Sequence, residues 1–148
     1  MARRLSEIAD QLEPTVVTPG PDRLHELGHG AFARALIESR REIGRFFPEE
    51  LFADPARDLL LELFIAAESG NRTPVSSACI AAAVPATTAL RWLVNLKGRE
   101  LIVYKDDPMD KRRSFVELTP DAIQQVRAYL ASVSARLSRA SPRPSARL

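Results

Sequence analysis

Basic side chains with the chemistry of anion binding recur between residues 86 and 113. Arg91 can donate paired hydrogen bonds to a guanine edge or to a phosphate. Lys111, Arg112 and Arg113 are consecutive and follow Asp110. Arginine and lysine bind phosphate through charge-assisted hydrogen bonds, so these residues indicate binding of a polyanion.

Residues 73–119 contain the elements that must position these groups. Thr73-Pro74 predicts the start of a short helix over 75–82, and the turn 83–85 leads into a second helix over 85–97. LIVYK (101–105) and FVELT (115–119) are β-branched and aromatic and predict two strands of a small hairpin. This order predicts a winged helix-turn-helix, in which the second helix enters the major groove of DNA and the polar loop 106–114 flanks it.

The second helix is predicted to have two faces, with Ala89, Leu90, Leu93 and Leu96 toward the core. Small hydroxylated side chains in its first turn would let its N-terminus approach bases and phosphates. In the loop, Asp110 is expected to hold the Arg112 guanidinium in place for a narrow minor groove. An ordinary amphipathic helix and a solvated hairpin turn are the alternative interpretations. The candidate DNA-binding residues are Ala86, Thr87, Thr88, Arg91, Asn95, Asp110, Lys111, Arg112 and Arg113.

The rest of the chain predicts a mostly helical protein around this hairpin. Residues 1–21 are expected to form a short helix (3–12) and a proline-rich arm, and 139–148 a basic disordered tail. Residues 22–138 form the predicted winged-helix domain, with its DNA-binding part at 54–119. Asp54 and Pro55 predict the start of a central apolar helix over 55–69. The apolar faces of the helical segments 22–47 and 121–138 exceed what so small a core needs, which predicts a dimer interface.

Composition and charge agree with a folded binding protein. The 148 residues suit one domain, 45% of them are apolar, and no apolar run has the length of a membrane span. The first residues lack the apolar segment of a secretory signal, and the single Cys79 excludes an internal disulfide, so we expect a cytoplasmic protein. Acids outnumber bases ten to six over 22–68, whereas bases outnumber acids eight to four over 70–115. This distribution predicts a local basic face.

The segments PATTALRWLVNLKGRELI and DDPMDKRRSFVELTPDA resemble the MarR family, the multiple-antibiotic-resistance type of regulator. Asp110 and Arg112 correspond to the family's Asp-x-Arg wing motif, and Leu118-Thr119 to the end of its wing. The resemblance implies a homodimeric transcriptional regulator of double-stranded DNA, with the terminal helices as dimerisation helices and a small-molecule effector between them and the DNA-binding part. Glu100 departs from the family, because a glycine is common at its position.

A second motif, His25-Glu26-Leu27-Gly28-His29, matches the H-E-x-x-H pattern of zinc hydrolases. A third ligand would have to be a carboxylate, such as Glu49 or Glu50, and Gly28 weakens the helix that the motif needs. We therefore expect no enzyme activity, no cofactor and no bound metal, and we expect Cys79 to be a small buried residue. A zinc-dependent hydrolase and a winged-helix module that binds another protein remain the alternatives.

Overall fold

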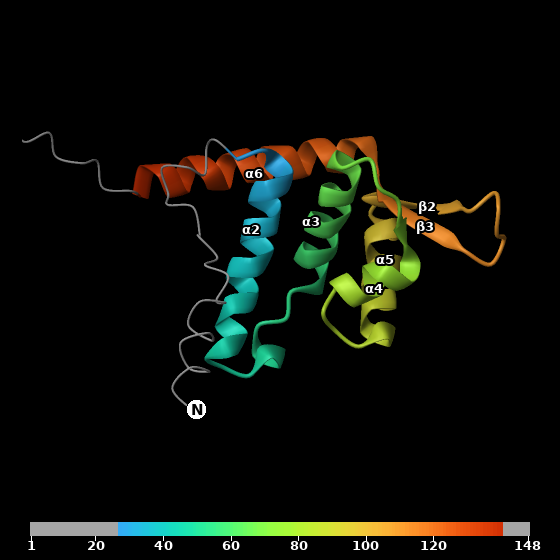
Figure 1. The fold of residues 1–148 in the computed structure, drawn as a ribbon, viewed down its shortest axis with the longest axis horizontal. Helices are drawn as coiled ribbons and strands as arrows, with labels where there is room; N and C mark the ends of the chain where they lie inside the picture. Colours follow the sequence, from blue (N-terminus) through green and yellow to red (C-terminus); the bar gives the residue numbers. More distant parts are fainter. Residues whose placement is uncertain (1–26, 141–148) are drawn as a thin grey trace, which may run out of the picture.

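The computed structural model describes residues 27–140. Its helices are α2 (His29–Glu42), α3 (Pro55–Glu68), α4 (Val75–Ala81), α5 (Ala86–Gly98) and α6 (Pro120–Ala140), and its strands are β1 (Thr73–Pro74), β2 (Ile102–Asp106) and β3 (Ser114–Leu118). Two short 3-10 helices, η2 (Ile43–Arg45) and η3 (Glu49–Leu51), connect α2 to α3. In Figure 1, α2 and α3 lie side by side, α6 crosses one end of both, and the β2–β3 hairpin projects from the side that carries α4 and α5.

The predicted fold class is confirmed, with one addition. The hairpin is present as β2 and β3, each shifted by one residue from the prediction. The predicted start of a helix after Thr73-Pro74 is confirmed, because α4 has Pro74 as its N-cap. Thr73 and Pro74 also form a short strand, β1, that was not predicted and that pairs with β3, Thr73 opposite Val116 and Pro74 opposite Phe115. β1 is an edge strand, where a proline removes no hydrogen bond that the sheet interior needs. The helix α4 begins at the next residue, Val75.

Helix α3 lies at the centre of the core, as its apolar sequence predicted. Asp54 caps it by accepting a hydrogen bond from the backbone N–H of Arg57 at 3.2 Å, and Pro55 is its first residue. Leu59, Leu61 and Phe64 are fully buried against side chains of α2, α5, α6 and the sheet. An apolar helix surrounded on several sides needs more than one apolar stripe, which explains its composition.

One charged side chain, Asp58 of α3, is buried in this core with 1% of its surface exposed. Its carboxylate accepts hydrogen bonds from Nε and Nη2 of Arg40 on α2, the first at 3.0 Å. Arg40 also donates to the carbonyl oxygen of Phe52 at 2.8 Å, and Arg41 lies 3.7 Å from Asp58. A buried carboxylate needs such partners, so this cluster joins α2, α3 and the connection between them.

The turns that flank α5 contain two non-glycine residues in the left-handed region, Ala83 (φ 54°) before the helix and Glu100 (φ 60°) after it. The second turn is tied to α6 through Thr119. The Thr119 hydroxyl donates to the carbonyl oxygen of Glu100 at 2.9 Å and accepts the backbone N–H of Ala122 at 3.2 Å, which caps α6. The predicted helix start at Thr119-Pro120 is therefore confirmed.

The predicted N- and C-terminal helices are present with different limits. The helix predicted within 22–47 begins at His29, after Gly28 as N-cap, and ends at Glu42. The helix predicted over 121–138 covers Pro120–Ala140. The predictions for 1–26 and 141–148 lie outside the described residues. Among the helices between residues 27 and 140, none is by itself long and apolar enough to cross a membrane.

Candidate nucleic-acid interface

Helix α5 has one buried and one exposed face, as its sequence predicted. Ala89, Leu93 and Leu96 are buried in the core. Leu90 was predicted to join them, but 45% of its surface is exposed, because it lies at the border of the buried stripe. The candidate DNA-binding residues Ala86, Thr87, Thr88, Arg91 and Asn95 all lie outside the buried set.

The exposed face of α5 offers several hydrogen-bond donors and no acid. Within the described residues, Arg91 has no ion-pair or hydrogen-bond partner. Asn95 accepts a hydrogen bond from Nε of Arg99 at 2.8 Å, which leaves its amide N–H groups free to donate. No glutamate or aspartate occurs between Ala86 and Gly98. An anion can therefore approach this face without meeting a carboxylate on the helix.

The β2–β3 hairpin, residues 102–118, forms the wing, and the predicted basic loop connects its two strands. At its tip, Asp110 was expected to hold the Arg112 guanidinium, but its carboxylate instead accepts the backbone N–H of Arg112 at 3.0 Å. Asp107 accepts the backbone N–H of Met109 at 2.8 Å. These bonds fix the loop, because a carboxylate two residues before an N–H readily forms such a turn.

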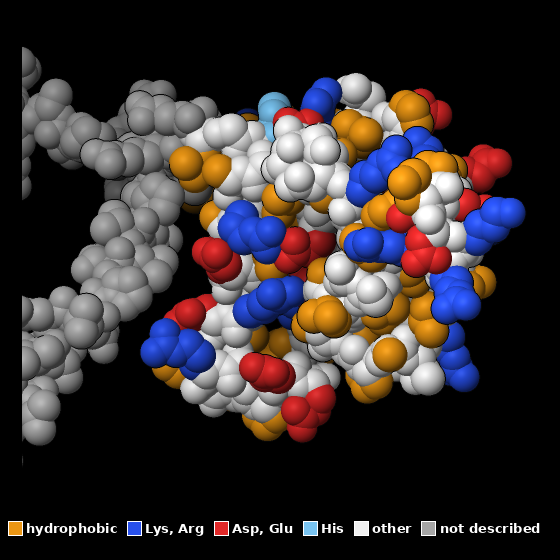
Figure 2. Space-filling model, turned by 45° about the vertical axis from the view of Figure 1, so that its right-hand side comes forward, with side chains coloured by type: hydrophobic (Ala, Val, Ile, Leu, Met, Phe, Trp, Pro, Cys, Tyr) orange, Lys and Arg blue, Asp and Glu red, His pale blue; other side chains and the backbone are white. Residues whose placement is uncertain are grey.

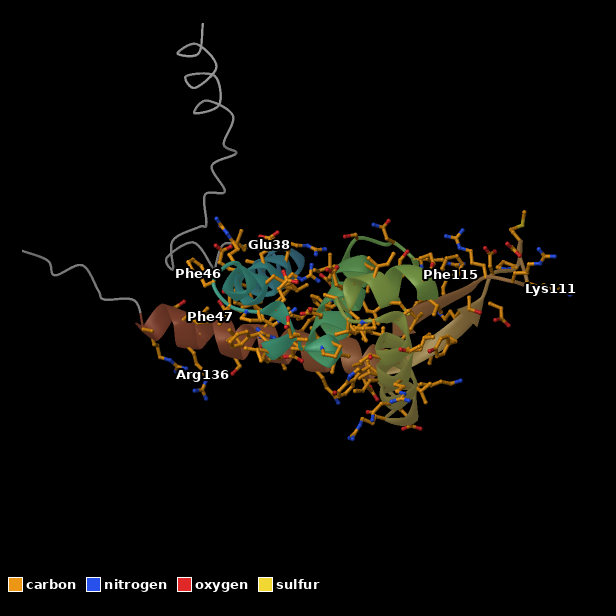
Figure 3. The ribbon with its side chains drawn as sticks, turned by 90° about the horizontal axis from the view of Figure 1, so that it is seen from below. Glu38, Phe46, Phe47, Lys111, Phe115 and Arg136 are labelled. Carbon is orange, nitrogen blue, oxygen red and sulfur yellow. The ribbon has the colours of Figure 1, made fainter. Side chains whose placement is uncertain are left out.

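All three acids of the wing loop thus accept hydrogen bonds from other groups of the same loop. The third, Asp106, accepts a hydrogen bond from the hydroxyl of Ser114 at 3.2 Å. Lys111, Arg112 and Arg113 are exposed, and no carboxylate of residues 27–140 forms an ion pair with them. Figure 2 shows Lys and Arg side chains along the edge of the molecule that carries the wing. Figure 3 shows Lys111 at the far end of the wing, away from the helical body.

Two exposed side chains that sequence reasoning did not single out belong to the same region. Val94 lies one helical turn beyond Arg91 and is 68% exposed. An apolar side chain on that face suits contact with a thymine methyl group. Arg72, just before β1, lies over the Phe115 ring, 5.3 Å from its centroid. The place of Val94 on the exposed face of α5 could have been predicted from its helical spacing. Arg72, by contrast, comes next to the wing only through the pairing of β1 with β3.

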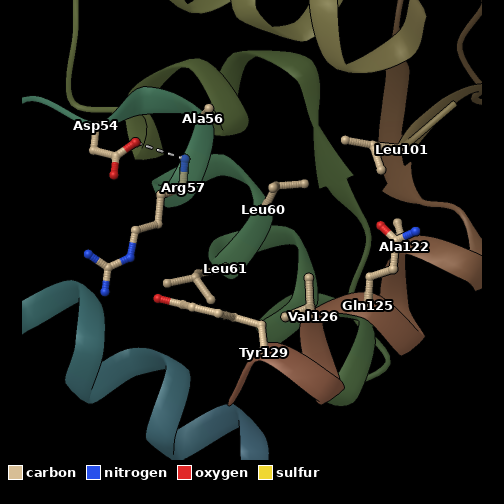
Figure 4. Close-up of a pocket in the computed structure, with 10 residues that line it drawn as sticks. All are labelled: Asp54, Ala56, Arg57, Leu60, Leu61, Leu101, Ala122, Gln125, Val126 and Tyr129. Carbon is tan, nitrogen blue, oxygen red and sulfur yellow. Dashed lines mark hydrogen bonds between the residues drawn. The ribbon is translucent and has the colours of Figure 1, made fainter. Parts of the chain in front are cut away.

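A cavity of about 430 Å³ lies between α3 and α6. Figure 4 shows that Leu60 and Leu61 of α3 face Val126 and Tyr129 of α6 across it. Its lining is mostly apolar, but Nε of Arg57 is buried beside it with no hydrogen-bond partner among the described residues. The other lining residues are Asp54, Ala56, Leu101, Ala122 and Gln125.

The residues of the two other sequence hypotheses lie elsewhere. His29 is the exposed first residue of α2, and His25 and Glu26 lie outside the described residues. Between residues 27 and 140, no three His, Cys, Asp or Glu side chains are grouped so that they could hold a metal ion. Cys79 on α4 is half-buried beside the core rather than fully buried, and burial raises the pKa of its thiol.

No protein-family model and no curated protein matches this sequence. Solved structures do match its fold. The S. aureus regulator MepR in its DNA-binding conformation is 18% identical over 74% of this chain and 76% of its own, with a TM-score of 0.50. A MepR mutant from a multidrug-resistant S. aureus clinical isolate is 18% identical over 78% and 86%, with a TM-score of 0.51.

The heme sensor PefR from Streptococcus agalactiae, in complex with heme, is 14% identical over 74% of both chains, with a TM-score of 0.50. At such low identities the likeness concerns the fold. The helix order, the three-stranded sheet and the wing agree with this comparison. The chain has the winged-helix fold of the MarR-family regulators.

Proposed function

We propose that this protein is a transcriptional regulator that binds specific sequences of double-stranded DNA as a homodimer and responds to a small ligand. Helix α5 would enter the major groove, and the wing would reach the adjacent minor groove. Two such units related by a two-fold axis would bind half-sites about one helical turn apart. A role on chromosomal DNA would place the protein in the cytoplasm.

The observation that carries this proposal is the distribution of charge on the wing. The three acids of its loop accept hydrogen bonds from the loop itself, and Glu117 is paired with Lys105, whereas Lys111, Arg112 and Arg113 form no ion pairs among the described residues. A surface ion pair adds little stability, but an unpaired cation is available to neutralise a phosphate. The exposed face of α5 contains no acid either, so both elements suit the same polyanion.

Apolar surface on the opposite part of the molecule supports the homodimer. The buried residues of α6 are Ala122, Val126 and Leu130, all in its first half, and in Figure 1 its second half continues past α2. Leu137 on that second half is 40% exposed. Phe46 and Phe47, beside η2, are 74% and 56% exposed. A second copy of the chain would remove this apolar surface from water.

The cavity between α3 and α6 supports control by a ligand. Its volume of about 430 Å³ lies within the range of small-molecule sites. It touches α6, the proposed dimerisation helix, and α3, on which α4 and α5 pack. A ligand that fits the cavity in only one arrangement of these helices would shift the protein toward that arrangement. The structural neighbour PefR was solved with heme bound, so a related fold accepts a small molecule.

Selection of bound sequences from random duplex DNA, followed by titrations at several salt concentrations, tests the proposal. Arg112→Ala should weaken binding to all duplexes and reduce the slope of log K against log salt by about 0.9. Arg91→Ala should cost about 1–3 kcal/mol on the selected sequence, provided that it pairs with a guanine. Arg127→Ala is the control, because Arg127 lies on the first half of α6 and is already paired with Glu68.

The same experiment separates the alternative functions. A winged-helix module that binds another protein would enrich no DNA sequence and show no salt-dependent affinity for duplexes. Exposed Ile80 (80%) and Val94 (68%) on α4 and α5 would then be the contact surface for that partner. Unchanged affinity in both the Arg91 and Arg112 variants would show that the assigned DNA-binding surface is wrong.

A further inference from the structure

Phe115 lies at the point where β1 ends and the hairpin projects beyond the three-stranded sheet, which we call the base of the wing. Its aromatic ring is covered by cations rather than by the core. Its exposed fraction is 8%, yet it is not part of the hydrophobic cluster that contains its neighbours Val116 and Leu118. The guanidinium carbons of Arg72 and Arg113 lie 5.3 and 5.2 Å from the ring centroid. Both arginines are exposed to solvent. Phe115 is therefore a platform on which two arginine side chains stack.

The strand register explains how residues so far apart in sequence meet at one ring. Pro74 of β1 and Lys105 of β2 are both paired with Phe115 of β3. Arg72 precedes β1, and Arg113 ends the wing loop just before β3. The two arginines therefore reach Phe115 of the central strand β3 from different segments, Arg72 from the residues before β1 and Arg113 from the wing loop. Figure 3 shows Phe115 between the helical body and Lys111 at the wing tip.

This arrangement concentrates positive charge that no acid neutralises. Glu117, the nearest acid along β3, already forms an ion pair with Lys105, with Nζ and Oε2 2.7 Å apart. Neither Arg72 nor Arg113 forms an ion pair with any other residue between 27 and 140. Two guanidiniums around one ring repel each other, and this repulsion is relieved when an anion lies between or beside them. Arginine binds phosphate with two parallel hydrogen bonds, so phosphate is the anion that this pair suits best.

We infer that Arg72 and Arg113, stacked on Phe115, bind phosphates of the DNA backbone at the base of the wing. Phe115 is the positioning residue, because its ring orients both guanidiniums and reduces the conformational freedom they lose on binding. This inference rests on the proposed DNA-binding function and adds a second contact region to the one at the wing tip. Since the contacts are to phosphates, they strengthen binding to every sequence equally.

The test is fluorescence anisotropy with two labelled duplexes, one selected from random DNA and one unselected, over about 50 to 200 mM salt. Arg72→Gln and Arg113→Gln should each reduce the slope of log K against log salt by about 0.9 on both duplexes. Lys105→Gln should change it less, because that cation is already paired with Glu117. Arg127→Gln, on the first half of α6 and already paired with Glu68, is the control for loss of net charge.

The role of Phe115 is tested by Phe115→Leu, which removes the ring, and Phe115→Tyr, which keeps it. Phe115→Leu should lower the salt slope as the arginine variants do, and Phe115→Tyr should restore the wild-type slope. Thermal melts show whether each variant is folded, and if Phe115→Leu does not fold, the two arginine variants decide the question. A slope in Arg72→Gln equal to that of Arg127→Gln, or a lower melting temperature with an unchanged slope, would overturn the inference.

The failure of this inference can be distinguished from failure of the proposed function. No binding of either duplex by the wild-type protein would contradict the DNA-binding function itself. Normal wild-type binding that is weakened by Arg91→Ala and Arg112→Ala, but not by Arg72→Gln, would contradict only the contact at the wing base.

Discussion

Arg41 on α2 donates a hydrogen bond to the carbonyl oxygen of Ala81, the last residue of α4, over 2.9 Å. The last carbonyl groups of a helix lack partners within the helix, so this bond satisfies one of them. The same guanidinium nitrogen lies 3.7 Å from the buried carboxylate of Asp58. Through Arg41, the helix α2 is connected to the residue at which the turn toward α5 begins. A movement of α2 relative to α3 would therefore be transmitted to the turn before α5, the helix proposed to bind DNA.

Asp58→Ala should lower the free energy of unfolding by about 3 kcal/mol, because it leaves the guanidinium of Arg40, which is only 15% exposed, without its carboxylate. Urea denaturation followed by circular dichroism measures this loss. Asp58→Asn, which keeps the shape and one hydrogen-bond acceptor, should lose less. A change below about 1 kcal/mol for Asp58→Ala would mean that the cluster does not stabilise the fold.

Glu100→Gly should raise the free energy of unfolding by about 0.5–1 kcal/mol. At φ 60° a residue other than glycine is strained by about 1–2 kcal/mol, and Glu100→Gly relieves this strain. Part of the gain is offset because glycine has greater conformational freedom in the unfolded chain. Thermal melts measure the change. Glu100→Ala is the matched control, because it removes the charge but keeps the strain. An equal gain in both variants would assign the effect to charge rather than to backbone conformation.

Leu137→Glu should convert the proposed dimer into a monomer. The side chain lies on the second half of α6, which contributes no buried residue, so the variant should fold normally. A carboxylate placed in an apolar interface loses its hydration without gaining a partner. Sedimentation velocity at micromolar concentrations measures the change, with Gln124→Glu, an exposed position on the first half of α6, as the control. A wild-type protein that sediments as a monomer would contradict the homodimer.

Cys79 should react with iodoacetamide more slowly than a cysteine in an unfolded peptide at the same mildly alkaline pH. Burial raises the pKa of its thiol, so less thiolate is present in the folded protein. Because the thiol pKa is higher in the folded than in the unfolded protein, protonation of Cys79 favours the folded state. This contribution is present below the unfolded pKa and is lost as the pH rises through the folded pKa. Alkylation with and without urea, followed by mass spectrometry, compares the two states. Faster reaction in the folded protein would indicate a reactive thiol instead.

Local signals made much of this fold predictable from the sequence. The caps at Asp54 and Thr119 act within three residues, so their helix starts were predicted correctly. The wing followed from two β-rich segments separated by a polar loop, and the buried face of α5 from its helical spacing. Such features depend on neighbouring residues, which a sequence pattern contains directly.

The errors arose where contacts between distant segments decided the outcome. Thr73-Pro74 is too short to show a strand pattern, and it became β1 because β3 offered a free edge. Asp110 was expected to bind a guanidinium, but a backbone N–H two residues away lies nearer to its short side chain. Leu90 lies at the border of the buried stripe, where the bulk of neighbouring elements determines exposure.

The sequence by itself therefore determined the order of the elements, their capping residues and the basic wing, because local propensity and periodicity specify these. Only the tertiary structure decided that Asp58 is buried between two arginines of α2, and that Arg72 and Arg113 meet on the ring of Phe115. Burial and ion pairing depend on which segments come together in space, and a linear pattern of charges does not contain that information.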